Sequence, residues 1–181
     1  IWFRTDSGQQ GIVRAAPQYR RPLVLVPGLM GTGPRPGDQS WFSQRGLPPE
    51  ALAIDPFLGS FDDLIETLKN AGYQEGRDLF IAKYDWRLPP VIADGGNDGY
   101  LLNLTADDIS DATYQTGIDY LGQALRAAAD AWKLRYDTEP DLDAVDVIAF
   151  DAGGLIARAY LQSDAYGGAI TPNAGGASTL P

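Results

Sequence analysis

The sequence alternates short, continuously apolar runs with longer stretches in which apolar residues recur every three or four positions. The run Leu23–Val26 is entirely aliphatic and is followed by Pro27 and Gly28, which is typical of a strand buried on both faces. Similar runs at 79–86 and 145–150 predict two further strands. Strands that alternate with helices form βαβ units, so the sequence predicts an α/β fold with a mostly parallel sheet and flanking helices.

The helical stretches lie between and after these runs. A helix predicted before residue 72 has Ser60 and Asp63 at its start, a weak form of the capping box, and Gly72 at its end. The clearest helical period spans 118–132, and a shorter helix is predicted over 155–162. The period of the longer helix is carried by Ile118, Leu121, Leu125, Ala128 and Trp132.

The remaining segments divide the chain into an irregular or edge-strand lead-in over 1–21, a core portion over 22–165 and a Gly-rich tail or loop over 166–181. Within the core portion, the Gly- and Pro-rich residues 29–55 predict a long ordered loop, and 91–112 predict a surface insertion.

Three strands make a small sheet, and the strand beginning near Val145 would expose a hydrophobic edge. We therefore expect the chain to be an incomplete, N-terminal portion of a larger fold. A second chain or a C-terminal segment would complete the sheet.

Composition narrows the function further. The 181 residues include 24 acidic and 14 basic side chains, a formal net charge of −10, which argues against a nucleic-acid partner. No apolar run approaches the roughly 20 residues that a transmembrane helix needs. The chain has no cysteine and no histidine, so it carries neither a Ser-His-Asp nor a Cys-His device of its own, and we predict no metal and no cofactor. A soluble protein is expected, and a secreted or cell-surface location is compatible with the sequence.

The most informative stretch is 147–158, where a predicted strand runs directly into a helix through Ala149, Phe150, Asp151, Ala152 and two glycines. A turn this sharp needs small neighbours and lifts its central side chain, here Asp151, above the sheet at a helix N-terminus. This pattern is that of a nucleophile elbow. The alternative interpretation is that Asp151 is an ordinary N-cap and that the glycines serve only close packing.

Several blocks in order resemble the lecithin–cholesterol acyltransferase-like family of lipases and acyltransferases, which belong to the α/β-hydrolases. They lie at 22–32, 55–72, 76–80, 84–87 (Tyr-Asp-Trp-Arg) and 147–160. The resemblance implies an α/β-hydrolase fold, a role in lipid ester metabolism and a lipid or other ester-type small molecule as ligand.

Residue by residue, the resemblance places Asp151 at the nucleophile position. It also implies that the backbone N–H groups of Leu29 and Ala152 form the oxyanion hole. Asp85, Trp86 and Arg87 match the block after the second predicted strand, where an Asp–Arg pair could be structural or could contact substrate.

The chain departs from the family at the site itself, because Asp151 replaces the nucleophilic serine and no histidine is present. We favour a domain that lacks serine esterase activity. One alternative is an enzyme that uses Asp151 as nucleophile, or as a general base with a raised pKa, completed by a partner chain or a C-terminal half. Another is a noncatalytic ligand-binding module on the same fold.

Two weaker candidates lie outside the elbow. Trp41 and Phe42 could line an acyl pocket or a lid, although an aromatic pair more often serves packing. Asp107, Asp108 and Asp111 could hold calcium, but their spacing is not that of an EF-hand loop, and a solvated acidic surface is the favoured interpretation.

Overall fold

The computed structural model describes residues 19–93, 95, 101, 104–109, 113–136 and 142–166, together with four short strands near the two ends of the chain. Two of these pair antiparallel in the predicted lead-in, β1 (Trp2–Arg4) with β2 (Gln10–Ile12). The other two, β8 (Ala169–Ile170) and β9 (Ser178–Thr179), pair in the tail that was predicted to be loop.

The central sheet has three parallel strands in the order β6-β3-β7. They are β3 (Leu23–Val26), β6 (Leu79–Ile81) and β7 (Asp146–Ala149). All four residues of β3 are buried, as expected of the middle strand of a sheet that is covered on both faces. The predicted α/β class with a parallel sheet is confirmed.

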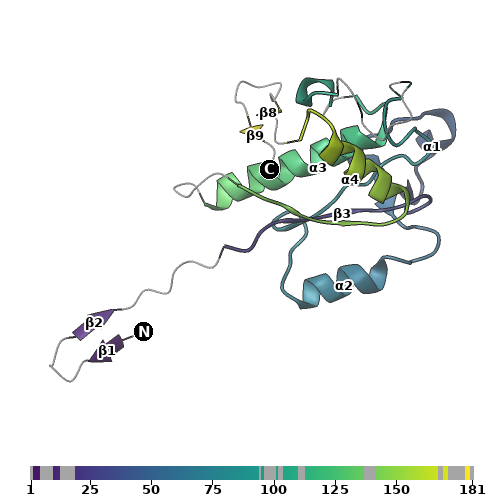
Figure 1. Cartoon of the computed structure of the whole chain (residues 1–181). Coiled ribbons are helices and arrows are strands. Elements are labelled where there is room, and N and C mark those ends of the chain that lie inside the picture. The colour runs from purple at the N-terminus through teal and green to yellow at the C-terminus, as the bar shows by residue number, and fades with distance from the viewer. Residues whose placement is uncertain are drawn as a thin grey trace.

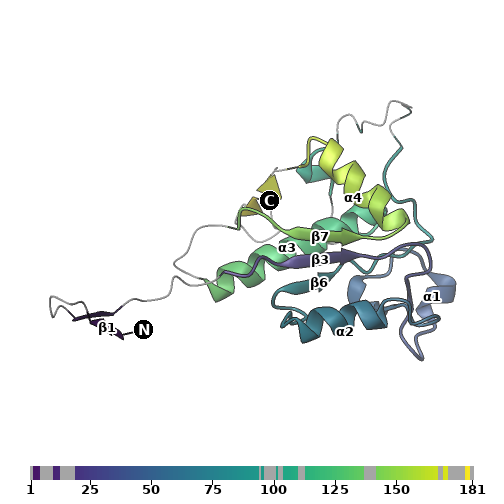
Figure 2. The same ribbon diagram turned by 60° about the horizontal axis from the view of Figure 1, so that its bottom comes forward.

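Helices cover both faces of this sheet (Figures 1 and 2). One face packs against α2 (Asp62–Asn70), whose Ile65 joins a cluster with Leu23 and Leu25. The other face carries α3 (Gly117–Arg135) and α4 (Ala152–Gln162), which contact each other over the larger core cluster. Each predicted helix is present, but α4 begins three residues earlier than predicted.

The strand predicted over 79–86 is wrong in its length, because β6 ends at Ile81. The amide of Ala82 still donates to the carbonyl of Leu25, but the next amide, that of Lys83, donates back to Ile81 at 2.8 Å. The chain thus leaves the sheet through a three-residue turn just beyond Ile81.

The long loop predicted over 29–55 is also partly wrong. It contains an antiparallel pair, β4 (Thr32–Pro34) with β5 (Leu52–Ile54), and two short helices, α1 (Ser40–Ser43) and η1 (Pro49–Ala51). These short elements were not predicted because the Gly and Pro content of the segment is typical of a loop.

The surface insertion predicted over 91–112 needs a similar correction. Leu104, Ala106 and Ile109 are buried in the larger core cluster. They flank or form the short helix η2 (Ala106–Asp108), which begins with a capping box between Thr105 and Asp108. A few apolar side chains within a polar segment therefore suffice to anchor it to the core.

The two ends of α2 show one prediction that fails and one that holds. Ser60 is not the N-cap of α2, because Phe61 holds that position, and the Ser60 amide donates instead to the buried carboxylate of Asp55. At the other end Gly72 has φ +93°, and the amides of Gly72 and Tyr73 donate to Lys69 and Leu68 in a Schellman motif.

The strand β7 is an edge of the sheet among the strands that the structure describes. The Asp146 and Phe150 amides donate toward β3, so those of the alternating residues between them face away from it. Val147 is 45% exposed at this edge. Completion of the sheet by a second chain or by a C-terminal segment stays a prediction.

Candidate functional site

The chain enters the sheet at its centre with β3, moves to one edge with β6 and then crosses to the other edge with β7. The helices that follow β3 and β7 therefore cover opposite faces of the sheet (Figure 2). In open α/β sheets, ligands bind beyond the carboxyl ends of the strands at such a switch point. The turn at Asp151 lies at this position, directly after β7.

This turn is as sharp as the sequence predicts. Asp151 has φ +50° and ψ −121°, values that resemble those of the first central residue of a type II′ turn, a position dominated by glycine. The Gly153 amide closes the turn by donating to the Phe150 carbonyl at 2.9 Å. A non-glycine residue in such a conformation costs about 1–3 kcal/mol and is found most often at functional sites.

Two glycines make room for the turn, and a third does not. A Cβ at Gly153 would lie 2.3 Å from the Val26 carbonyl oxygen, so α4 can cross the end of β3 only with glycine there. A Cβ at Gly28 would lie 2.7 Å from that of Asp151. A Cβ at Gly154 would meet no atom within 4 Å, so close packing does not require the second glycine of the pair.

The Asp151 carboxylate is exposed, and its hydrogen bond comes from the loop that follows β3. Its Oδ2 accepts a hydrogen bond from the Leu29 amide at 2.9 Å, and no side-chain bond caps α4. The Leu29 amide, and secondarily that of Ala152, hold the pKa of Asp151 below its ordinary value. The raised pKa expected of a general base is therefore wrong. The structure thus brings together the three residues named at the elbow, Asp151, Leu29 and Ala152.

Tyr84 was identified from the sequence only as part of the block 84–87, and its electrostatic interaction with Asp151 was not predicted. Its ring is buried and packs against Tyr120, and its hydroxyl has no hydrogen-bond partner among the described residues. Burial, and to a lesser degree the charge of Asp151, raises the pKa of Tyr84 to about 12. The hydroxyl therefore stays protonated at neutral pH, in electrostatic range of the elbow carboxylate.

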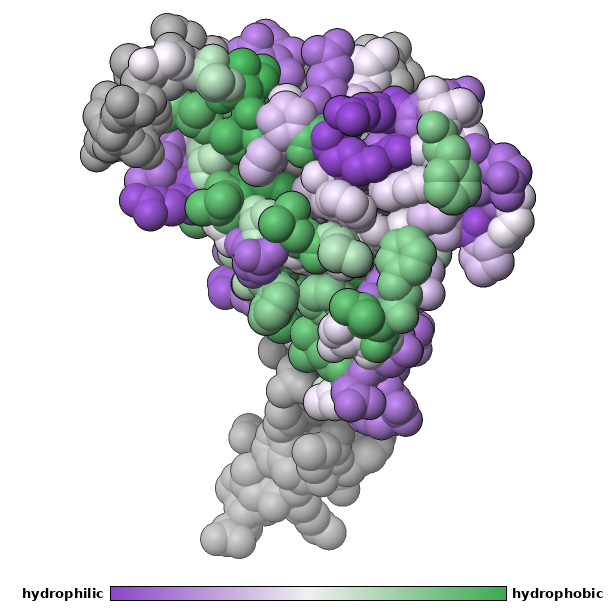
Figure 3. All heavy atoms as spheres, turned by 90° about the vertical axis from the view of Figure 1, so that its right-hand side faces the viewer, coloured by the Kyte–Doolittle hydropathy of each residue, from purple (hydrophilic) through white to green (hydrophobic). Residues whose placement is uncertain are grey.

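Apolar side chains surround the elbow on three neighbouring loops and on the first turn of α4. Figure 3, which faces the side of the molecule where the strands end, shows apolar surface running through this face. We call the exposed apolar residues of these segments the elbow rim: Leu29, Met30, Phe57, Leu58, Phe150 and Leu155. The loops are joined by contacts such as the edge-to-face pair of Phe61 with Phe150, whose ring centroids are 5.8 Å apart. The site thus combines one ionised carboxylate with an apolar surround.

The pair of Asp85 and Arg87 is occupied in holding the loop that follows β4. Arg87 donates to both carboxylate oxygens of Asp85, at 2.7 and 2.6 Å, and to the carbonyls of Trp41 and Gln44. Its guanidinium lies 3.6 Å from the centroid of the Trp41 ring. Trp86 donates from its indole N–H to the Thr32 carbonyl at 2.9 Å. These contacts agree with the structural interpretation of the pair.

The weaker candidates from the sequence occupy different environments in the structure. Trp41 is buried under Arg87, whereas Phe42 points outward and is exposed. Asp108 caps η2, and Asp111 lies outside the described residues. Among the residues that the structure describes, no group of three or more acidic side chains is placed to hold a metal ion.

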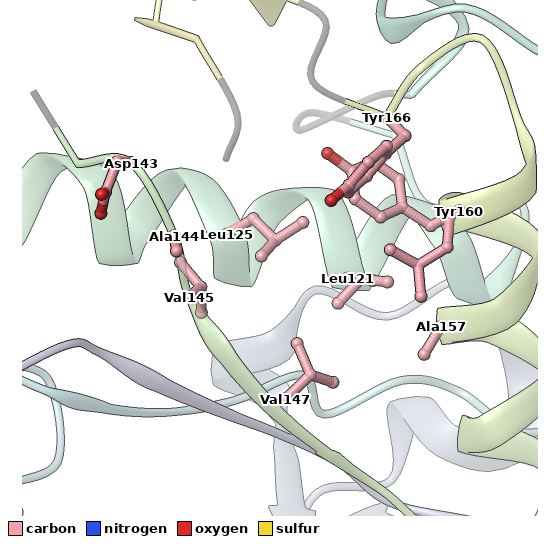
Figure 4. A pocket seen from close by; sticks show the side chains of 10 residues that line it. Leu121, Leu125, Asp143, Ala144, Val145, Val147, Ala157, Tyr160 and Tyr166 are labelled. Carbon is pink, nitrogen blue, oxygen red and sulfur yellow. The ribbon is translucent and has the colours of Figure 1, made fainter.

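A separate cavity of about 140 Å³ lies beside β7, away from the elbow (Figure 4). Val147 of β7, Leu121 and Leu125 of α3, and Tyr160 of α4 point into it. The cavity is apolar and lies on the α3 and α4 face of the β7 edge, so it belongs to this edge of the sheet rather than to the elbow.

The chain matches no protein-family model, no curated protein and no solved structure. The α/β class therefore rests on the structure itself, and the family resemblance rests on the sequence blocks. No helix in the described part of the chain is both long enough and apolar enough to cross a bilayer.

Proposed function

We propose that this chain is a lipase- or acyltransferase-like α/β-hydrolase domain that takes up a lipid or other ester-type small molecule at its elbow without serine esterase activity. The observation that carries the proposal is the 2.9 Å hydrogen bond from the Leu29 amide to Asp151 Oδ2. In a serine hydrolase, an amide in this loop stabilises the oxyanion of the transition state.

The chemistry of the site supports binding rather than acyl transfer. A carboxylate that already accepts the Leu29 amide leaves that amide unavailable to a developing oxyanion. Attack of Asp151 on an ester carbonyl would give a mixed anhydride, and no histidine is present to activate water for its hydrolysis. The lowered pKa of Asp151 also makes it a weak base.

The elbow rim supplies the affinity for an acyl chain. A fully buried leucine side chain contributes about 1.5–3 kcal/mol relative to an exposed one. Leu58 is 72% exposed in the loop before α2 and can bury much of its surface against an alkyl chain. We expect the ligand to lie across the rim with its polar end near Asp151 and Leu29.

A long-chain p-nitrophenyl ester tests both halves of the proposal, because binding and release of nitrophenolate are measured on one sample. We expect saturable binding, detected through quenching of tryptophan fluorescence, and no turnover. Leu58→Lys should weaken binding about tenfold. Leu134→Lys is the matched control, since Leu134 is 88% exposed on α3 outside the rim.

Two outcomes would overturn the proposal in different ways. Turnover that disappears in Asp151→Ala, with an ester adduct on the Asp151 peptide by mass spectrometry, would establish an aspartate nucleophile. Equal binding by the Leu58 and Leu134 variants would remove the elbow rim as the ligand site.

A further inference from the structure

A polar pocket lies where the strands begin, at the opposite end of the sheet from the elbow. It has a volume of about 480 Å³ and is lined by Tyr19, Arg20, Gly72, Arg77 and Arg135. Arg20 precedes β3, Arg77 precedes β6, and Arg135 ends α3. Small-molecule sites usually have volumes of about 300–1,000 Å³, so this pocket is large enough for one.

The carboxylate that anchors two of the three arginines is already saturated. Asp78 is buried, and its Oδ1 accepts the Gln74 amide at 2.6 Å. Its Oδ2 accepts Arg77 Nε and Nη2 at 3.3 and 3.0 Å, and Arg135 Nη1 at 3.2 Å. Each guanidinium has five N–H donors, so most donors of these two arginines are not used by Asp78.

Arg20 brings a third positive charge that no carboxylate of the described residues balances. Its guanidinium lies 4.8 Å from the centroid of the Tyr73 ring, a cation–π contact. Gly72 lets it approach the backbone, because a Cβ there would lie 2.9 Å from Arg20 Nη1. The neighbouring acidic side chain, Glu75, is paired with Lys69 at 3.4 Å.

Among the described residues, the lining of the pocket therefore carries three positive charges, and the one carboxylate bound to that lining is Asp78. An excess of two positive charges matches a phosphate monoester, which carries about −1.5 to −2 at neutral pH. Guanidinium groups bind such oxyanions through paired, charge-assisted hydrogen bonds.

We propose that the pocket of Arg20, Arg77 and Arg135 binds a soluble phosphate monoester, with the phosphate on the three guanidinium groups and the organic group beside the Tyr19 ring. Asp78 fixes the orientation of two of these arginines and is a positioning residue. The proposal does not depend on the elbow or on the function proposed for it.

Arg20 is the decisive residue for a test. Arg77 and Arg135 form ion pairs with Asp78 whether or not a ligand binds. The positive charge of Arg135 also stabilises the C-terminus of α3 through the helix dipole. Arg20 is exposed and makes no ion pair within the described part of the chain, so Arg20→Gln should fold normally. Arg158→Gln on α4 removes the same charge far from the pocket and is the matched control.

The experiment is calorimetric titration of the full chain with phenyl phosphate and with inorganic phosphate, and a flotation assay with phosphatidylcholine vesicles containing phosphatidic acid. We expect phenyl phosphate to bind, Arg20→Gln to weaken it about tenfold, and Arg158→Gln to leave it unchanged. Amide chemical shifts should move around residues 72–78.

Three results would overturn the proposal. Phenyl phosphate does not bind, or both arginine variants weaken it equally, which would indicate a general response to net charge. Alternatively, the chain binds the vesicles and not phenyl phosphate, which would assign the pocket to a lipid surface. A circular dichroism melt of each variant separates loss of binding from loss of fold.

Discussion

The two ends of the central sheet each carry an aspartate at a critical place, and the two carboxylates differ in every respect that matters to their roles. Asp78, where the strands begin, is buried and accepts hydrogen bonds from one amide and two arginines. Asp151, where the strands end, is exposed, has a positive φ and accepts the Leu29 amide.

Asp78 stabilises the fold through its hydrogen bonds, whereas the fold holds the backbone of Asp151 in a strained conformation. The bonds to Asp78 offset the cost of its burial. The conformation of Asp151 costs energy, and its hydrogen bond with the Leu29 amide is exposed to solvent. The contacts that the structure shows at Asp151 are fewer than those at Asp78, as expected if Asp151 has the ligand-binding role proposed for the elbow.

The largest expected change in the free energy of unfolding comes from removing an arginine that pairs with a buried aspartate, Arg87 with Asp85 or Arg77 with Asp78. Arg87 is 17% exposed and holds the fully buried Asp85, so Arg87→Gln should lower the free energy of unfolding by about 3–5 kcal/mol. Arg77 is 40% exposed, and Arg135 remains on Asp78 without it, so Arg77→Gln should cost only about 1 kcal/mol. Urea denaturation measures both losses, and equal losses would contradict the role of Arg87 in holding the buried Asp85 and the loop that follows β4.

The structural features that the sequence predicted correctly are those that depend on residues close together in the chain. Leu23–Val26, the stripe of α3 and the turn at Asp151 could be located because continuous apolar runs, helical spacing and small residues at fixed offsets are local signals. The roles of Asp78 and Tyr84 could not, since both depend on partners distant in sequence, such as Arg135 and Tyr120.

The same reasoning explains the errors at the elbow and in the loops. A raised pKa of Asp151 was considered only as one alternative, in which this residue acts as a general base, and the structure contradicts it. The residue that sets this pKa is Leu29, which is 122 positions away. The strands β4 and β5 were missed because each has three residues and is stabilised mainly by pairing with the other.

The next largest effect is a difference in stability between substitutions at two adjacent glycines, Gly153 and Gly154, at the start of α4. Gly153→Ala should cost about 1–3 kcal/mol or more, because its Cβ would lie 2.3 Å from a carbonyl oxygen of β3. Gly154→Ala should be neutral or stabilise α4 by about 0.5–1 kcal/mol, since nothing lies within 4 Å of its Cβ. Thermal melts of the two variants give the comparison, and similar melting temperatures would show that α4 does not pack on β3 as described.

Acid should destabilise the fold by protonating two buried carboxylates, Asp78 and Asp55, that the fold holds ionised. Burial alone would raise the pKa of Asp78, but the Gln74 amide and the arginines hold it below the ordinary value of 3.8. Asp55 is shifted in the same direction by the amides of Leu58 and Ser60, against its burial. A lowered folded-state pKa contributes stability that is complete above the unfolded pKa and is lost as pH falls through the folded one.

We therefore expect the urea midpoint to be steady above about pH 5 and to fall below about pH 4. Asp78→Asn should lower the midpoint at neutral pH and flatten this decline. An identical pH profile for the wild type and this variant would show that Asp78 is not charged in the fold.

The smallest expected effect is the most specific to the elbow. Asp151→Gly removes backbone strain of about 1–3 kcal/mol and loses one hydrogen bond that is exposed to solvent. It also adds about 0.5–1 kcal/mol of chain entropy to the unfolded state. These terms nearly cancel, so the variant should match the wild type within about 1 kcal/mol by urea denaturation. A larger loss would show that Asp151 supports the fold rather than a ligand. An unchanged stability, with binding of the acyl ester altered, is what a residue kept for its ligand should show.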